Sequence, residues 1–113
     1  MMDTAFYERR LREELAALAA ASEDGKDARS PVILDQQSVG RLSRMDALQQ
    51  QAMAVATEER RRIRMLALRA ALERVAAGAF GDCVRCGEKI SVKRLDLDPT
   101  IATCIACARA TVE

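Results

Sequence analysis

The sequence contains no histidine and no tryptophan, and only three aromatic residues, Phe6, Tyr7 and Phe80. Without an imidazole, the chain excludes histidine-based acid–base catalysis, serine–histidine–aspartate triads and zinc sites with nitrogen ligands. Half of the residues are hydrophobic, but 21 of these are alanine. Side chains this small pack helix against helix, but they do not fill the core of a β-sandwich or of a doubly wound sheet. The composition therefore predicts a mainly α fold.

An excess of one charge is also lacking, because 18 basic and 17 acidic residues leave a net charge of +1. This near-balance excludes a strongly basic nucleic-acid footprint over the whole chain. No run of 18 apolar residues occurs, and no signal sequence stands at the start. We therefore expect a cytoplasmic protein with no membrane partner.

Two helices are predicted before the first cysteine. The first extends from about residue 3 to residue 22, and Gly25 follows as a stop signal. The second extends from about residue 38 to residue 77, with no proline in between to break it. A short and a long helix joined by a connecting segment predict an antiparallel helical hairpin, a coiled coil, in which the N-terminal end of the long helix projects as a tip.

Apolar residues at helical spacing indicate which faces of these helices are buried. On the first helix they form one stripe: Tyr7, Leu11, Leu15, Leu18 and Ser22. On the long helix a main seam is predicted at Leu42, Met45, Gln49, Ala52, Ala56, Ile63, Leu66 and Ala70. A second seam, limited to the C-terminal end, is predicted at Met65, Leu68, Leu72 and Val75.

Positive charge is concentrated in the second half of the long helix, where residues 58–78 carry six arginines and three glutamates. Residues 1–30 carry five basic and seven acidic residues. This difference predicts complementary faces on two antiparallel helices. The alternative is a phosphate-binding stripe formed by Arg60, Arg61, Arg62 and Arg64.

All four cysteines lie in the last third of the chain as two pairs, Cys83 with Cys86 and Cys104 with Cys107. Cytosolic thiols stay reduced, so paired cysteines argue for a metal before a disulfide. The two-residue gap within each pair lets both thiolates face one ion, and Gly87 suits the turn that follows the first pair. The doubled motif predicts one structural Zn²⁺ per chain with these four ligands, and the alternatives are a redox pair or an iron–sulfur site. Because protein groups fill all four positions, catalytic zinc is disfavoured.

Other residues between and beside the cysteines extend this pattern: Phe80, Gly81, Ile90, Arg94, Leu95, Pro99 and Thr100. With them, the segment resembles the zinc finger of the DksA/TraR family, the DnaK suppressor proteins, which are bacterial transcription regulators. The resemblance covers about 30 residues, and the preceding hairpin is similar to the family in layout.

The resemblance implies that the chain binds RNA polymerase rather than DNA. The hairpin of such proteins enters the secondary channel of the polymerase, where acidic residues at the tip approach the active centre. Initiation at selected promoters then changes, with guanosine tetraphosphate as a further ligand at the polymerase interface. Only six residues follow Cys107, so little of the C-terminal helix of longer relatives is expected.

The acidic tip motif of the family is Asp-x-x-Asp-x-Ala, and two segments are partly similar to it. Asp46 stands beside Ala47, whereas Asp24 and Asp27 keep the acid pair. We expect Asp46 and Ala47 to be the partner-contacting tip residues, with the Asp24–Asp27 pair as the alternative. A purely structural alternative for Asp46 is a capping box with Ser43, three residues earlier.

These observations predict a helical hairpin at residues 1–78 and a four-cysteine zinc finger at residues 79–113. The predicted function is non-enzymatic regulation of transcription through direct contact with RNA polymerase. The alternative function is a zinc-ribbon module that binds nucleic acid directly through its basic helix face.

Overall fold

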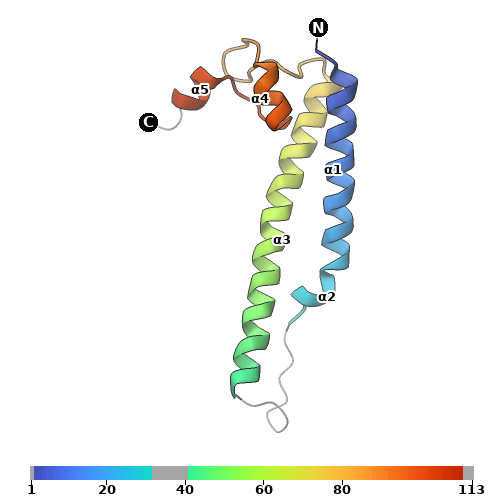
Figure 1. Cartoon of the computed structure of the whole chain (residues 1–113), viewed down its shortest axis with the longest axis vertical. Helices are drawn as coiled ribbons and strands as arrows, with labels where there is room; N and C mark the ends of the chain where they lie inside the picture. Colours follow the sequence, from blue (N-terminus) through green and yellow to red (C-terminus); the bar gives the residue numbers. More distant parts are fainter. Residues whose placement is uncertain (1, 32–40, 111–113) are drawn as a thin grey trace. The chain divides into compact units, whose positions relative to one another are not determined.

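The computed structural model describes residues 2–31 and 41–110, which are mainly helical (Figure 1). The helices are α1 (Thr4–Asp24), α2 (Lys26–Arg29), α3 (Arg41–Ala76), α4 (Val92–Leu97) and α5 (Ile105–Ala110). The described residues contain no strand, and their one β-bridge joins Asp82 to Lys89. The predicted mainly α fold is therefore confirmed, and both long helices lie close to their predicted bounds.

The chain forms two compact units, and both long helices contribute to each. We call Met1–Ala16 together with Leu66–Glu113 the cysteine unit, because it contains all four cysteines. We call Ala17–Met65 the hairpin unit. The predicted division into a helical hairpin at residues 1–78 and a zinc finger at residues 79–113 stays a prediction.

The core of the cysteine unit is built from three parts of the sequence that are distant from one another. Its buried hydrophobic residues are Tyr7 and Leu11 of α1, Leu68 and Ala71 of α3, and Phe80, Cys83, Ile90 and Leu95 after α3. The rings of Tyr7 and Phe80 lie 5.4 Å apart, centroid to centroid. The start of α1 and the end of α3 are therefore packed against the segment that carries the cysteines.

Two polar contacts join α1 to α4 in the same unit. The hydroxyl of Tyr7 donates a hydrogen bond to the carboxylate of Asp96, and Arg10 Nη1 donates to the Asp96 carbonyl at 2.9 Å. The hydrogen bond to Asp96, followed by burial, raises the pKa of Tyr7 above its ordinary value. These two residues are 89 positions apart in the sequence, so no local pattern indicates their contact.

The main seam predicted on α3 is wrong. Met45, Ile63 and Leu66 are all more than half exposed, and Gln49, Ala52 and Ala56 are exposed as well. The side chain of Leu42 lies outside the described residues. The second predicted seam is the correct one, since Leu68 is completely buried and its neighbours Met65, Leu72 and Val75 are partly buried.

Continued toward the start of α3 in steps of three and four, the correct seam reaches Arg61, Glu58, Ala54 and Gln51. Three of these residues are polar. Gln51 and Glu58 contact α1, α2 or the residue after α2, and Arg61 pairs with Glu58 of its own helix. The contacts pair residue 22 with residue 58, and residues 29 and 30 with residue 51, so the two arms are antiparallel. The prediction of the main seam followed the spacing of apolar residues, so it missed a seam that contains polar residues.

Local chemistry explains where the long helices begin and end. The Asp3 carboxylate accepts a hydrogen bond from the Phe6 N–H at 3.2 Å, which satisfies a free donor at the start of α1. After α3, Gly78 has a φ of 73°, and the Ala79 N–H donates to the Arg74 carbonyl at 2.8 Å. Glycine adopts this left-handed conformation without a steric cost, so Gly78 ends α3.

Candidate metal centre

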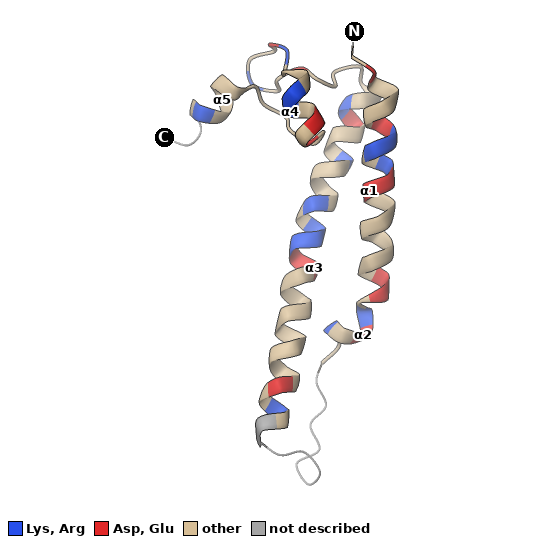
Figure 2. Cartoon of the chain, viewed as in Figure 1, with Lys and Arg blue, Asp and Glu red and all other residues tan. Residues whose placement is uncertain are grey.

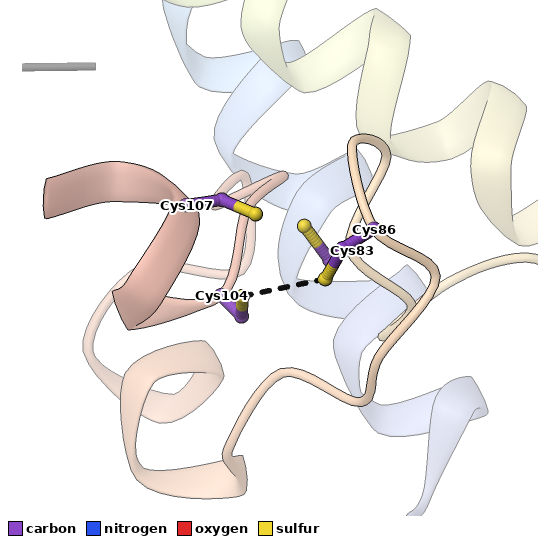
Figure 3. Close-up of side chains that lie close together, drawn as sticks. All are labelled: Cys83, Cys86, Cys104 and Cys107. Carbon is purple, nitrogen blue, oxygen red and sulfur yellow. Dashed lines mark hydrogen bonds between the residues drawn. The ribbon is translucent and has the colours of Figure 1, made fainter. Parts of the chain in front are cut away.

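The first cysteine pair lies in a tight loop between α3 and α4. The Cys83 N–H donates to the Glu88 carbonyl at 2.7 Å, and the Gly87 N–H donates back to the Cys83 carbonyl at 2.9 Å. Gly87 has a φ of 79°, as expected for the turn that closes such a knuckle. The loop places the side chains of Cys83 and Cys86 on the same side of the turn (Figure 3).

The second pair is positioned by α4, the loop after it, and α5. Ser91 caps α4 by accepting from the Arg94 N–H, and Asp98 accepts from both the backbone N–H and the hydroxyl of Thr100. Cys104 immediately precedes α5, and Cys107 lies within it. The Val84 N–H donates to the Ala102 carbonyl at 2.9 Å, which ties the two knuckles together.

Two arginines support the loop that leads to Cys104. Arg74 of α3 donates to the Thr100 carbonyl at 3.2 Å, and Arg94 of α4 donates to the Thr103 carbonyl at 3.0 Å. Partial burial lowers the pKa of Arg74 from its ordinary value. Lys89, another nearby cation, forms an ion pair with Asp82 at 2.7 Å.

The four thiols converge on one point (Figure 3). Their sulfur atoms all lie within 4.8 Å of one another, and those of Cys86 and Cys104 are 3.6 Å apart. A tetrahedral zinc ion with Zn–S bonds of about 2.3 Å requires sulfur atoms about 3.8 Å apart. The donor set and the spacing therefore fit one zinc ion with four thiolate ligands. Cys83 is buried and Cys86 is exposed, so solvent reaches one side of the cluster.

The surroundings of the thiols favour deprotonation of the first cysteine in each pair. The backbone N–H of Cys104, and then those of Cys86 and Arg85, lower the pKa of Cys83 to about 6. The backbone N–H of Cys107 likewise lowers the pKa of Cys104. The pKa of Cys107 is raised, first by its hydrogen bond with Cys104, because adjacent thiols share protons. The backbone is thus already arranged to stabilise negative charge on sulfur, which a metal ion requires.

The predicted tip residues lie in the hairpin unit. Asp46 is exposed and Ala47 is partly exposed, both in the second turn of α3 as described. Figure 2 shows acidic (red) and basic (blue) residues along α3. Ser43 is not a helix cap, because Arg41 and Leu42 before it are already helical, so the capping-box explanation of Asp46 is wrong. Asp24 and Asp27, the alternative pair, are exposed at the end of α1 and in α2.

The arginine stripe of α3 is largely occupied by neighbours in the same helix. Arg61 pairs with Glu58 at 2.8 Å and Arg62 pairs with Glu59 at 2.6 Å. Arg60 donates to the Thr57 hydroxyl at 3.1 Å. These contacts leave fewer guanidinium groups for phosphate than the sequence indicates.

No pocket opens in the surface of residues 2–31 and 41–110. Within the same ranges, no helix has both the length and the apolar character needed to cross a bilayer. The four-thiol cluster is therefore the one feature of the described residues with the chemistry of a metal or ligand site.

Comparison with known proteins agrees with this centre. The sequence model of the prokaryotic dksA/traR C4-type zinc finger matches residues 78–111.

The structure of transcription factor DksA2 from Pseudomonas aeruginosa is similar, with 25% identity and a TM-score of 0.76, over 96% of this chain and 81% of that chain. The solution structure of the DnaK suppressor protein from Agrobacterium tumefaciens C58 has 27% identity and a TM-score of 0.58, over 97% and 95% of the two chains. None of the curated proteins matches the sequence. The resemblance first drawn from the residues around the cysteines is confirmed, together with a single structural zinc ion.

Proposed function

Starting from a DksA/TraR zinc finger at residues 78–111 and a fold shared with DksA2, we propose that this chain regulates transcription by binding RNA polymerase. The observation that carries the proposal is the combination of a four-thiol cluster with an antiparallel helical hairpin in one chain. The chain acts without catalysis of its own, as a cytoplasmic protein.

Cys83, Cys86, Cys104 and Cys107 are the four zinc ligands in this proposal. When bound, the ion supplies a structural cross-link, because all four of its positions are occupied by protein. It holds together a segment that has few large apolar side chains of its own. Zinc thereby maintains the cysteine-bearing segment that packs against the start of α1 and the end of α3 within the cysteine unit.

The hairpin unit supplies the contact with the polymerase in this proposal. Asp46, with Ala47 beside it, is the acidic tip residue that approaches the active centre through the secondary channel. A carboxylate in a desolvated channel acts strongly on a nearby metal ion or basic group, since the local dielectric constant is low. The resemblance also implies guanosine tetraphosphate as a further ligand at the interface with the polymerase.

Direct binding of nucleic acid is the competing function, and two observations count against it. Arg61 and Arg62 are paired with carboxylates, and the three aromatic residues offer no exposed series of stacking platforms. Binding of random duplex DNA is therefore expected to be weak and to decrease steeply with salt.

The test is in vitro transcription with purified RNA polymerase, combined with a pull-down of the polymerase by this chain. Asp46→Ala is expected to leave zinc content, melting temperature and polymerase binding nearly unchanged, while the effect on initiation is lost. Asp24→Ala with Asp27→Ala is the matched control and is expected to keep the effect. A wild-type chain that neither binds polymerase nor alters initiation would contradict the proposal. Regulation that survives Asp46→Ala but not the control would assign the tip to Asp24 and Asp27.

A further inference from the structure

The hairpin unit has no hydrophobic core among the side chains that the structure describes. Every buried hydrophobic residue lies in the cysteine unit, and the described side chains of Ala17–Met65 are partly or fully exposed. On α3 the larger apolar residues of this unit, such as Met45, Met53 and Ile63, are more than half exposed. Contacts other than apolar burial must therefore hold the two arms of the unit together.

A cluster of four polar side chains bridges the arms. We call Ser22, Arg29, Glu58 and Arg61 the clasp. Glu58 of α3 accepts a hydrogen bond from the Ser22 hydroxyl of α1 at 2.5 Å. Its other carboxylate oxygen lies 2.9 Å from Arg29 Nη1 of α2 and 2.8 Å from Arg61 Nη1 of its own helix. One carboxylate thus contacts α1, α2 and α3.

The clasp is shielded more than an ordinary surface ion pair. The side chains of Arg29, Glu58 and Arg61 are 21%, 23% and 19% exposed. Gly25 provides the room for this, since a Cβ there would lie 3.1 Å from Arg29 Nη1 and 3.8 Å from Arg61 Nη1. Two guanidinium groups therefore converge at a glycine, and Glu58 is the carboxylate that lies between them.

The next residue, Glu59, provides an internal comparison. It forms an ion pair with Arg62 at 2.6 Å, but both side chains are more than half exposed and both belong to α3. The two glutamates share a helix, a charge and an arginine partner three residues later. Only Glu58 also reaches the opposite arm.

We propose that Glu58 is a positioning residue that keeps the arms of the hairpin unit closed and so holds the N-terminal end of α3, with Asp46, in place. The part of this role that concerns Asp46 rests on the proposed function. Removal of the carboxylate leaves Arg29 and Arg61 close together without a counter-charge, which separates the arms. The hydrogen bond from Ser22, together with the two arginines, lowers the pKa of Glu58, so the clasp is ionised at neutral pH.

Opening of the arms is expected to be local, because the cysteine unit has its own buried core and zinc cluster. The first experiment is hydrogen exchange on the zinc-loaded full chain, with Glu58→Gln and Glu59→Gln as a matched pair. In Glu58→Gln, amides of residues 44–65 are expected to exchange about tenfold faster, as for the loss of one charge-assisted hydrogen bond. Amides around Leu11, Leu68 and Leu95 are expected to be unaffected.

Glu59→Gln is expected to change exchange by less than about twofold, as for an exposed ion pair. Equal amide exchange rates in Glu58→Gln and Glu59→Gln would show that the clasp does not hold the arms together. If amide exchange becomes faster by the same factor in both units of Glu58→Gln, the opening is not local. Should Glu58→Gln lose zinc or helicity, Ser22→Ala removes one contact of the clasp and is measured in its place with the same criteria.

The second experiment separates positioning from tip chemistry in the transcription assay. Open arms lower the fraction of competent molecules, so Glu58→Gln is expected to raise the concentration for half-maximal effect several-fold while the maximal effect is kept. Asp46→Ala is expected to abolish the maximal effect instead. An unchanged midpoint despite faster exchange would overturn the positioning role. A wild-type chain without any effect would refute the proposed function, and the exchange result would stand by itself.

Discussion

The two units of this small chain are held together by different physical means. The cysteine unit has buried side chains from α1, α3 and the cysteine-bearing segment, with the four thiols beside them. The hairpin unit has the clasp, and its described side chains are partly or fully exposed. Burial is non-directional and proportional to area, whereas an ionic cluster is specific in geometry and sensitive to the loss of one group.

Helical continuity therefore does not imply uniform stability. Helix α3 belongs to both units, and Leu68, one of its completely buried residues, lies only ten positions after Glu58. The same helix is thus anchored by apolar burial at one place and by charge at another. Local opening free energies in proteins follow such differences in contact type.

The largest expected effect is that of zinc removal, which should break the cysteine unit and spare much of the hairpin unit. Apparent binding free energies for structural zinc are about 10–16 kcal/mol, and this free energy is largely folding free energy. A chelator, or Cys104→Ser, is expected to remove amide protection from residues 80–110 first, while part of the hairpin stays helical. Circular dichroism and residue-resolved exchange measure this, and re-addition of zinc to the chelated wild type should restore protection. If residues 17–65 unfold together with residues 80–110, the two units are not stabilised separately.

A smaller but still large effect is expected from Leu68→Ala. This side chain is completely buried, so its truncation should cost about 2–5 kcal/mol of unfolding free energy. Leu66→Ala on the same helix is the control, and it should change stability by no more than about 0.5 kcal/mol, because Leu66 is 52% exposed. Denaturant melts of both variants measure the difference. If both substitutions lower the free energy of unfolding equally, the apolar seam predicted from the sequence, which includes Leu66, is buried after all.

The smallest expected effect concerns Tyr7, which is the single tyrosine of the chain. Asp96 and burial raise its pKa, so its contribution to stability is present below pH 10 and is lost as the pH rises through the folded value. Tyr7→Phe should cost about 1 kcal/mol at neutral pH. Absorbance of the phenolate gives the pKa directly, and Asp96→Asn should bring it back toward the ordinary value. A wild-type pKa at the ordinary value would show that the contact with Asp96 does not persist in solution.

Much of the metal centre could be predicted because the chemistry of its ligands is local. The spacing Cys-x-x-Cys, the glycine after the first pair and the residues up to Pro99 all lie in one short segment. The apolar stripe of α1 and the seam from Met65 to Val75 were likewise readable, because burial there follows helical periodicity.

The clasp and the contact between Tyr7 and Asp96 could not be predicted in this way. The charge difference between residues 1–30 and 58–78 predicts complementary helix faces, but it does not indicate that Glu58 and Arg61 lie in the seam, because charged residues are rarely placed there. The available signal was their position, because Glu58 and Arg61 continue the seam of Leu68 in steps of three and four. Tyr7 and Asp96 are 89 residues apart, and only the folded cysteine unit brings them together.

The discontinuity of the cysteine unit also determines the order in which the chain folds during its synthesis. The contacts of the hairpin unit lie within one continuous segment, Ala17–Met65, and are complete once that segment has left the ribosome. Tyr7 must wait for Asp96, which is 89 residues later, or roughly 5–18 s at typical rates of translation. The first residues of α1 thus lack part of their packing partners until the metal-binding segment emerges. Newly made chains are expected to be most vulnerable to aggregation and proteolysis during this interval, and zinc supply then sets how soon it ends.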